Sequence, residues 1–219
     1  MTTLLIATRN AHKVGEIQAI LGAQFRCLTL KEFPDAPPVI EDADTFVGNA
    51  TKKAVELAKW LAQDESGKRK AESENYFVLA DDSGLEVDAL NGAPGVHSAR
   101  FAALDKTENS KDAENNAKLL RLLKEVPPKK CTSRFRCVIA LVQLTPHSPL
   151  LTPHLFDGAC QGRIQLTASG AGGFGYDPLF VPDGFTQSFA ELGEDVKNKI
   201  SHRAKALEKL KFYFSRLPI

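Results

Sequence analysis

The sequence predicts an α/β fold, organised as a single two-lobed domain over residues 1–219. A short apolar run at residues 4–7 leads through a polar loop into apolar residues at helical spacing, which is the order of an α/β unit. A second apolar run, at residues 77–80, lies beyond a long amphipathic segment. With 219 residues, 43% of them hydrophobic, the chain can bury one large core or two small ones.

Strands are expected wherever apolar residues run on or alternate. These segments are residues 4–7, 25–30, 77–80, 135–144 and 155–166. Loops are expected at a highly charged, a turn-rich and a proline-rich segment, which are residues 64–75, 91–101 and 145–153. The turn-rich loop is long for a compact domain, and such loops are more often functional than idle.

Four helices are expected from apolar residues that recur at a spacing of three and four. The first follows the strand at 4–7, with its stripe at Val14, Ile17, Ile20 and Leu21. The second covers about 45–62, with its stripe at Phe46, Ala50, Ala54, Leu57, Ala58 and Leu61. The third covers 112–124, and the last follows Ser201 as N-cap, with its stripe at Ala206, Leu207, Leu210, Phe214 and Leu217.

The loop before the first helix is a natural seat for a phosphate group. Thr8 or Asn10 can cap the helix, and the free N–H groups of its first turn would face an anion. Lys13 and Glu16 fall on the side away from the apolar stripe, and helix patterning alone favours two solvated charges there. The loop is not a glycine-rich Walker loop, which disfavours a P-loop NTPase.

Two adjacent carboxylates, Asp81 and Asp82, follow the apolar run at 77–80. Ser83-Gly84 predicts a turn directly after them, before a second alternating segment. Carboxylates at the end of a buried strand can reach a metal ion or a water molecule. Neighbours on a strand point to opposite faces, so we expect the two to differ in role. Asp-Asp-Ser-Gly is also ordinary turn chemistry, and the motif alone leaves both interpretations open.

Further acids precede the long helix at 45–62. Asp42 and Asp44 are the usual complement to a helix dipole, whereas the role of Glu41 stays open. On the helix, Lys53 either leans toward the carboxylates or pairs with Glu56.

Residues 171–178 combine glycines with two aromatic side chains and an acid. Glycines let the backbone approach a ligand closely, and rings can stack on a flat base, although a hairpin turn whose rings fill the core has the same composition. His202 and Arg203 would lie at the positive end of the last helix with donors for a ligand, or simply form a solvated first turn.

The composition excludes several classes of protein. A formal net charge of +1 gives no overall field for nucleic acid or a membrane surface. The four cysteines lack metal-ligand spacing and are expected as reduced thiols. No export signal or stretch of 18 apolar residues is found, so a cytoplasmic location is expected.

Five motifs follow one another along the chain. They are Thr8-Arg9-Asn10-Ala11-His12-Lys13-x-x-Glu16, Ala80-Asp81-Asp82-Ser83-Gly84-Leu85, Gly92-Ala93-Pro94-Gly95-x-x-Ser98-x-Arg100-Phe101, Gly173-Phe174-Gly175-Tyr176-Asp177-Pro178 and Ser201-His202-Arg203. In this order they resemble the inosine/xanthosine triphosphate pyrophosphatase family. The resemblance implies a mixed, long central sheet with flanking helices and two lobes that enclose a substrate cleft. It also implies a homodimer and Mg²⁺-dependent hydrolysis of ITP, dITP and XTP to the monophosphate and pyrophosphate.

The resemblance also implies residue roles. Asp82 would be the catalytic base and a metal ligand, and Glu41 the second metal ligand. The triphosphate-binding segment would be Thr8, Arg9, Asn10, Ala11, His12 and Lys13, and Lys53 and Ser83 would also bind substrate. The base would be enclosed by Phe174, Gly175, Tyr176, Asp177, Lys197, His202 and Arg203. A 6-oxo purine needs donors, which Arg203, His202 or N–H groups around Gly175 could supply.

Two other functions stay open at this stage. One keeps the chemistry but changes the substrate to pyrimidine or modified nucleoside triphosphates. The other is a nucleotide-binding regulator without turnover, although such a protein would be expected to lack acids such as Glu41 and Asp82. The preference among ITP, dITP and XTP, and the residue that rejects guanine, do not follow from the sequence.

Overall fold

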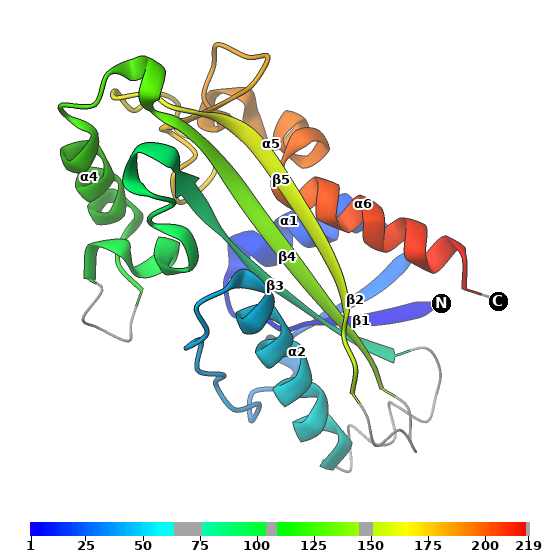
Figure 1. The fold of residues 1–219 in the computed structure, drawn as a ribbon. Helices are drawn as coiled ribbons and strands as arrows, with labels where there is room; N and C mark the ends of the chain where they lie inside the picture. Colours follow the sequence, from blue (N-terminus) through cyan, green and yellow to red (C-terminus); the bar gives the residue numbers. More distant parts are fainter. Residues whose placement is uncertain (64–75, 104–108, 145–150, 218–219) are drawn as a thin grey trace. The chain divides into compact units, whose positions relative to one another are not determined.

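A computed structural model of the chain describes residues 1–63, 76–103, 109–144 and 151–217 (Figure 1). Its strands are β1 (Thr2–Ile6), β2 (Phe25–Thr29), β3 (Tyr76–Val87), β4 (Thr132–Leu144), β5 (His154–Ile164) and β6 (Phe180–Pro182). They form one sheet in the order β2-β1-β3-β4-β5-β6. β1 pairs in parallel with β2 and β3, and β5 pairs antiparallel with β6. The predicted α/β fold with a mixed sheet is therefore confirmed.

Within the described ranges, the helices are α1 (Ala11–Leu21), α2 (Phe46–Gln63), α4 (Asp112–Leu123), α5 (Phe189–Ile200) and α6 (His202–Ser215), and 3₁₀ segments lie between several of the elements. The four predicted helices are present, and Ser201 caps α6 as expected, because its Oγ accepts from the Ala204 N–H at 3.1 Å. α5 was not predicted. Its sequence signal is a capping box, in which Ser188 and Glu191 satisfy each other's backbone N–H groups.

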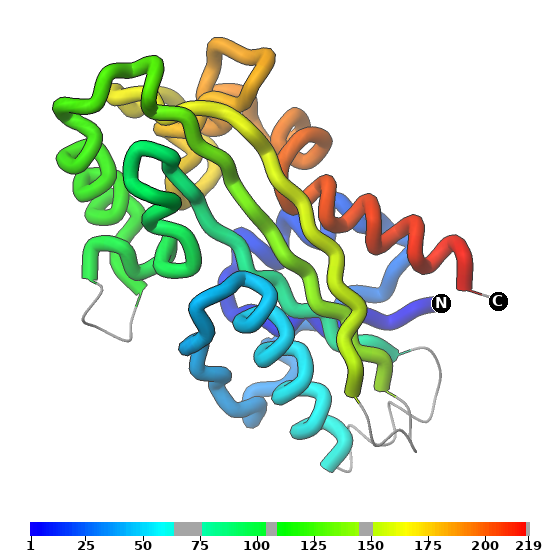
Figure 2. The backbone as a smooth tube through the Cα atoms, viewed as in Figure 1, coloured from blue at the N-terminus to red at the C-terminus, as the bar shows by residue number. Residues whose placement is uncertain are grey.

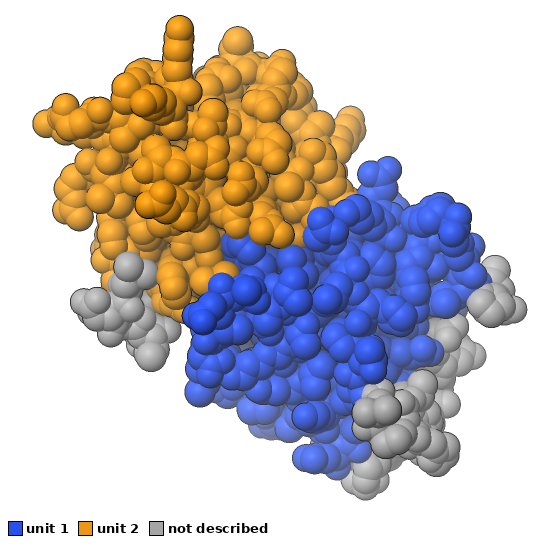
Figure 3. All heavy atoms as spheres, viewed as in Figure 1, with its two compact units in different colours: residues 1–82, 138–157, 206–219 blue, residues 83–137, 158–205 orange. Residues whose placement is uncertain are grey.

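The chain divides into two compact units, described separately below (Figure 3). Unit 1 comprises Met1–Asp82, Val138–Asp157 and Ala206–Ile219, and unit 2 comprises Ser83–Cys137 and Gly158–Lys205. Two of the predicted loops, residues 64–75 and most of 145–153, lie outside the described residues. Among the residues that the structure describes, every helix is too short or too polar to cross a membrane.

Unit 1 packs its helices on the start of the sheet. The predicted stripe of α2 is buried throughout, with Ala50, Ala54 and Ala58 fully covered. α1 and α6 lie side by side (Figure 2), where the Lys211 ammonium donates to the Ile20 carbonyl at 3.1 Å. Aromatic contacts close this core, because the Phe214 ring lies 5.2 Å from that of Phe25 and 5.0 Å from that of Phe77.

Unit 2 has its own core, built around β4, β5, α4 and α5. The ring of Phe135 lies 4.7 Å from that of Phe180 and 6.2 Å from that of Phe189. Leu119 and Leu123 of α4 are fully buried in the same cluster. The hydrophobic residues of unit 2 therefore form a packed core that supports the 171–178 segment.

The predicted turn at Ser83-Gly84 is wrong, because β3 runs without interruption from Tyr76 to Val87. Leu85 and Val87 continue the alternation and are fully buried in the core of unit 2, and a turn would take them out of it. The chain turns later, at Asn91, which has a left-handed φ of 53°. Asp81 and Asp82 therefore lie inside a strand, not at its end.

Candidate active site

Asp81 and Asp82 point to opposite faces of β3, and each meets a lysine from a different helix. The Lys13 ammonium of α1 lies 2.6 Å from Asp81 Oδ1. Glu16 of α1 is also buried, so the prediction that Lys13 and Glu16 are solvated is wrong. The apolar periodicity underestimated how wide a face of α1 is buried. A charged side chain can also be buried where it meets a partner of opposite charge.

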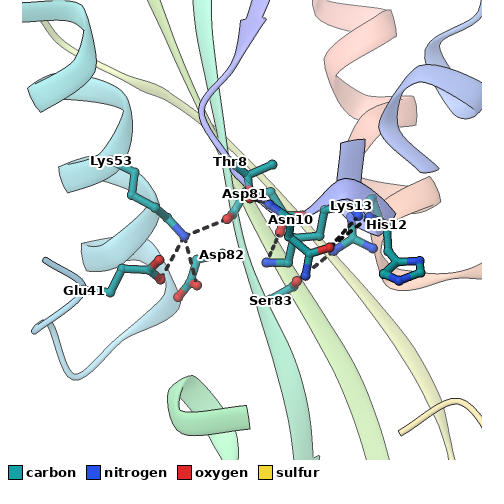
Figure 4. Close-up of polar contacts among 10 residues, drawn as sticks. Thr8, Asn10, His12, Lys13, Glu41, Lys53, Asp81, Asp82 and Ser83 are labelled. Atoms are coloured by element: carbon teal, nitrogen blue, oxygen red, sulfur yellow. Dashed lines mark hydrogen bonds and ion pairs between the residues drawn. The ribbon is translucent and has the colours of Figure 1, made fainter. Parts of the chain in front are cut away.

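On the other face, Lys53 of α2 makes three contacts with the acidic residues (Figure 4). Its ammonium lies 2.9 Å from Glu41 Oε2, 3.3 Å from Asp82 Oδ1 and 2.8 Å from the carbonyl oxygen of Asp81. The alternative pairing of Lys53 with Glu56 is therefore wrong. Glu56 lies 4.0 Å from Lys52, which also binds Asp42 at 2.6 Å.

Burial and charge set the proton affinities of this cluster. Burial, only partly offset by Lys53 and Lys13, raises the pKa of Asp82 to about 6. Burial also favours protonation of Glu41, but the Lys53 ammonium outweighs it and holds the pKa of Glu41 below its ordinary value. Burial alone would lower the pKa of Lys53, yet Asp82 and Glu41 raise it. The cluster thus combines a stable ammonium group with one carboxylate whose pKa suits a general base.

Glu41 is positioned by contacts that the sequence did not reveal. Asn49, on the buried side of α2, accepts from the Ala43 N–H at 3.0 Å and donates to the Ala43 carbonyl at 3.2 Å. Arg9 donates to the Ala36 carbonyl at 2.9 Å. The loop that carries Glu41 is therefore tied to α2 and to the loop after β1. A buried asparagine within an otherwise apolar helix face is the available signal.

The loop from Thr8 to Lys13 starts α1 as predicted, with Asn10 as its N-cap. Asn10 Oδ1 accepts from the N–H groups of His12 and Lys13, at 3.0 Å and 3.1 Å. The Asn10 N–H in turn donates to Thr8 Oγ1 at 3.2 Å. The expectation of free amide groups is wrong for His12 and Lys13, because the capping side chain already uses them.

Within unit 1, Glu41 and Asp82 are two carboxylates that could hold a hard cation. Asp82 Oδ2 is buried, and no hydrogen-bond donor reaches it among the described residues. Such an oxygen is costly unless a cation or a proton meets it. Mg²⁺ is usually held by one or two carboxylates together with substrate phosphates. Across the described part of the chain, no three histidine, cysteine, aspartate or glutamate side chains gather for a metal.

In unit 2, the acid and the lysine of the predicted base pocket form a buried ion pair. The Lys197 ammonium donates to Asp177 Oδ2, with both side chains at most 3% exposed. The same oxygen accepts from the Phe174 N–H at 2.8 Å. Lys197 also lies 4.5 Å from the centre of the Phe174 ring, a cation–π distance. One carboxylate thus fixes both the lysine and the backbone at Phe174.

Of the two rings in this segment, only Phe174 remains partly exposed. Tyr176 is 3% exposed and belongs to the core of unit 2, where its hydroxyl donates to the Ser98 carbonyl at 2.9 Å. Within unit 2, the core-filling interpretation therefore holds for Tyr176, while Phe174 keeps surface for stacking.

His202 and Arg203 are buried, so the solvated first turn is excluded. The His202 ring stacks on that of Phe135, with centroids 4.8 Å apart and 14° between the planes. Arg203 is 1% exposed, and its Nη2 donates to Ser83 Oγ at 2.8 Å. A buried guanidinium fixed by a hydroxyl is a rigid source of hydrogen-bond donors.

Comparisons with known proteins cover almost the whole chain. The model of the Ham1 family matches residues 4–213. A dITP/XTP pyrophosphatase of Desulforamulus reducens is 45% identical over 217 residues, which cover 99% of this chain and 97% of that protein. One from Geobacter sulfurreducens is 46% identical over 212 residues, 96% of each.

Solved structures agree. A HAM1 protein from Coxiella burnetii has a TM-score of 0.78 at 35% identity, covering 98% of this chain and 99% of the other. A nucleoside-triphosphatase / dITP/XTP pyrophosphatase from Mycobacterium abscessus has a TM-score of 0.70 at 34% identity, covering 100% of each.

Proposed function

The chain belongs to the Ham1 family, and on that premise we propose that it hydrolyses ITP, dITP and XTP to the nucleoside monophosphate and pyrophosphate. The observation that carries the proposal is the cluster in which the buried Lys53 and Asp82 meet the partly exposed Glu41, with one oxygen of Asp82 that meets no donor among the described residues. The names of relatives at 40–46% identity support the substrate class.

Asp82 is proposed as the general base. A carboxylate with a pKa of about 6 is largely ionised at neutral pH and still takes up a proton readily. Asp82 would take the proton of a water molecule that attacks the α-phosphorus, so that a new P–O bond forms and the bond to pyrophosphate breaks. Lys13 and Lys53 would offset the charge of the triphosphate, with the loop from Thr8 to Lys13 as its seat.

Glu41 and Asp82 are proposed to hold Mg²⁺, because hard oxygen ligands suit this ion and Asp82 Oδ2 has no hydrogen-bond partner among the described residues. When bound, the ion would neutralise phosphate charge and lower the pKa of a water ligand. Lys53 contacts both carboxylates and so keeps them together.

Recognition of a 6-oxo purine is proposed to rest on unit 2. Phe174 would stack on the base, beside Gly175, Tyr176, Asp177 and Lys197 as its enclosing residues. The Gly175 N–H donates to Asp112 at 2.6 Å, so it is not the donor for the 6-oxo group. His202 and Arg203 are proposed as side-chain donors for this group, beside Ser83 as a contact to substrate. A 6-amino group would leave such buried donors unpaired, which disfavours adenine.

The wider expectations remain proposals. A family match over residues 4–213 supports one functional domain built from both units. The homodimer, the cytoplasmic location and a substrate cleft between lobes are likewise predictions, and a sedimentation measurement of the mass in solution checks the first.

The test is pyrophosphate release from ITP, XTP, GTP, ATP and dUTP with Mg²⁺, for the wild type and Asp82→Asn. Fast turnover of ITP and XTP that the variant loses supports the proposal. Preference for dUTP would favour the pyrophosphatase for pyrimidine or modified nucleotides. ITP binding without turnover of any substrate would identify a regulator.

The proposed role of Glu41 as a metal ligand is tested by comparing two variants. Glu41→Gln should raise the Mg²⁺ concentration needed for half-maximal activity by about tenfold, since it removes one charged ligand. Asp42→Asn removes the neighbouring carboxylate, which contacts Lys52, and should leave the Mg²⁺ requirement unchanged. Equal effects of the two variants would overturn the role of Glu41.

A further inference from the structure

The backbone N–H and the carbonyl of Gly175 are both hydrogen-bonded to side chains of one helix of unit 2. Its N–H donates to Asp112 Oδ2 at 2.6 Å, and its carbonyl accepts from Asn116 Nδ2 at 3.0 Å. Asp112 and Asn116 lie one turn apart on α4, so they project from the same face of the helix. Both contacts join residues about 60 positions apart in the sequence.

Gly175 lies in the middle of the 174–177 segment, which is proposed to enclose the base. Phe174 precedes Gly175, and its N–H binds Asp177, which carries the Lys197 ammonium. Gly175 itself has a φ of 62°, and a Cβ there would meet no atom within 4 Å. Packing on the Cβ side of Gly175 therefore does not hold this peptide in place, and the hydrogen bonds must do so.

The first turns of α4 are anchored elsewhere in unit 2. Asn115 is 2% exposed, accepts from the Ala102 N–H at 2.8 Å and donates to the Ala99 carbonyl at 3.2 Å. Ser98, in the same segment, accepts from the Tyr176 hydroxyl. α4 and the segment from Gly95 to Ala103 thus form a fixed frame, and the loop around Gly175 is tied to it by three hydrogen bonds, two with α4 and one with Ser98.

We propose that Asp112 and Asn116 are positioning residues that fix the Gly175 peptide and thereby the placement of Phe174 and Asp177 for the base. The inference rests on the proposed function and adds two residues of α4 to it. They act through the backbone and do not touch the base, so their loss should weaken nucleotide binding and leave the chemical step intact.

The experiment compares Asp112→Ala, Asp112→Asn and Asn116→Ala with the control Glu114→Ala, in steady-state hydrolysis of ITP. Glu114 lies in the same turn of α4 and carries the same charge, but its carboxylate contacts the Lys111 N–H. Asp112→Ala and Asn116→Ala should each raise KM by about fivefold or more, with kcat within about twofold of the wild type. Asp112→Asn keeps an acceptor oxygen and should restore most of the affinity.

A second readout needs no nucleotide. The chain has three tyrosines, so 3-fluorotyrosine labelling gives three ¹⁹F resonances, of which Tyr176→Phe assigns one. Asp112→Ala should shift or broaden the Tyr176 resonance, and Glu114→Ala should not. An unmoved resonance with unchanged KM would overturn the proposal, as would a fall in kcat alone or an Asp112→Asn variant as weak as Asp112→Ala. If the wild type fails to hydrolyse ITP, the proposed function falls while the resonance still decides the positioning role.

Discussion

In unit 1, the carboxylates of Glu41, Asp81 and Asp82 meet two ammonium groups, whereas in unit 2 the carboxylate of Asp177 meets the ammonium group of Lys197. The first set comes from four separate stretches of chain. The second is a buried ion pair beside the aromatic rings of Phe174 and Phe189. On the proposed function, the carboxylates of unit 1 would bind a cation, whereas the residues of unit 2 would select the base by shape and hydrogen bonds.

The largest effect is expected in the cluster of unit 1. Asp82→Asn removes the proton acceptor but keeps the side-chain size, so turnover of ITP should fall by about 10²- to 10⁴-fold. Stopped assays of pyrophosphate release at saturating ITP measure it, with circular dichroism as the check on folding. Retention of more than about a tenth of the wild-type rate would contradict the role of Asp82.

In unit 2, removing the lysine of the buried ion pair should chiefly lower the free energy of unfolding. Lys197→Met leaves the Asp177 carboxylate buried without its ammonium, which should lower the free energy of unfolding by about 3–5 kcal/mol. Urea denaturation measures this cost, and Lys197→Met/Asp177→Asn should recover part of it. The control is Lys209→Met at the exposed pair with Asp157, where a loss under about 1 kcal/mol is expected. Equal losses in the two variants would mean that the buried ion pair contributes no more to stability than the exposed one.

Gly173→Ala sharpens the comparison by attacking the backbone of unit 2. Gly173 has a φ of 73°, and an added Cβ would lie only 2.9 Å from Asp177 Cβ. Strain and overlap together should cost about 2–4 kcal/mol. Gly175→Ala is the control, since it shares the positive φ but has open space, and about 1 kcal/mol is expected. Thermal denaturation of both variants should show this order, and the reverse order would contradict the clash.

The smallest effect is a gain in unit 1. Gly15 lies inside α1, and a Cβ there would meet nothing within 4 Å. Gly15→Ala should therefore stabilise the protein by about 0.5–1 kcal/mol through helix propensity. A higher midpoint of urea unfolding with unchanged ITP turnover is expected. A loss of activity would show that α1 needs its flexibility beside Lys13.

The sequence was sufficient where one segment determines its own structure. The apolar stripe of α2 and the opposite faces of Asp81 and Asp82 follow from periods of 3.6 and 2, and both are confirmed. The same logic erred at Ser83-Gly84, where burial of Leu85 overrides the local turn preference. Lys13 was misplaced because its partner lies on a distant strand.

The candidate site divides in the same way. Asp82, Glu41 and Lys53 were named from their sequence motifs, and the structure brings these three together. Asn49, Asp112 and Asn116 were not, because their importance lies in backbone groups of other segments. Contacts of this kind leave no periodic pattern in one sequence, although the capping box of α5 was readable and was overlooked.

The placement of two acids on one strand also constrains how this gene can change. β1 fixes the register of β3 from Tyr76 to Leu79, two residues before Asp81. A deletion or insertion of one codon between Leu79 and Asp81 would exchange the faces of the two carboxylates and present Lys53 with the wrong neighbour. Hydrophobic residues of the strand can drift by substitution, but its length cannot change by a single step, so we expect related genes to keep this spacing fixed.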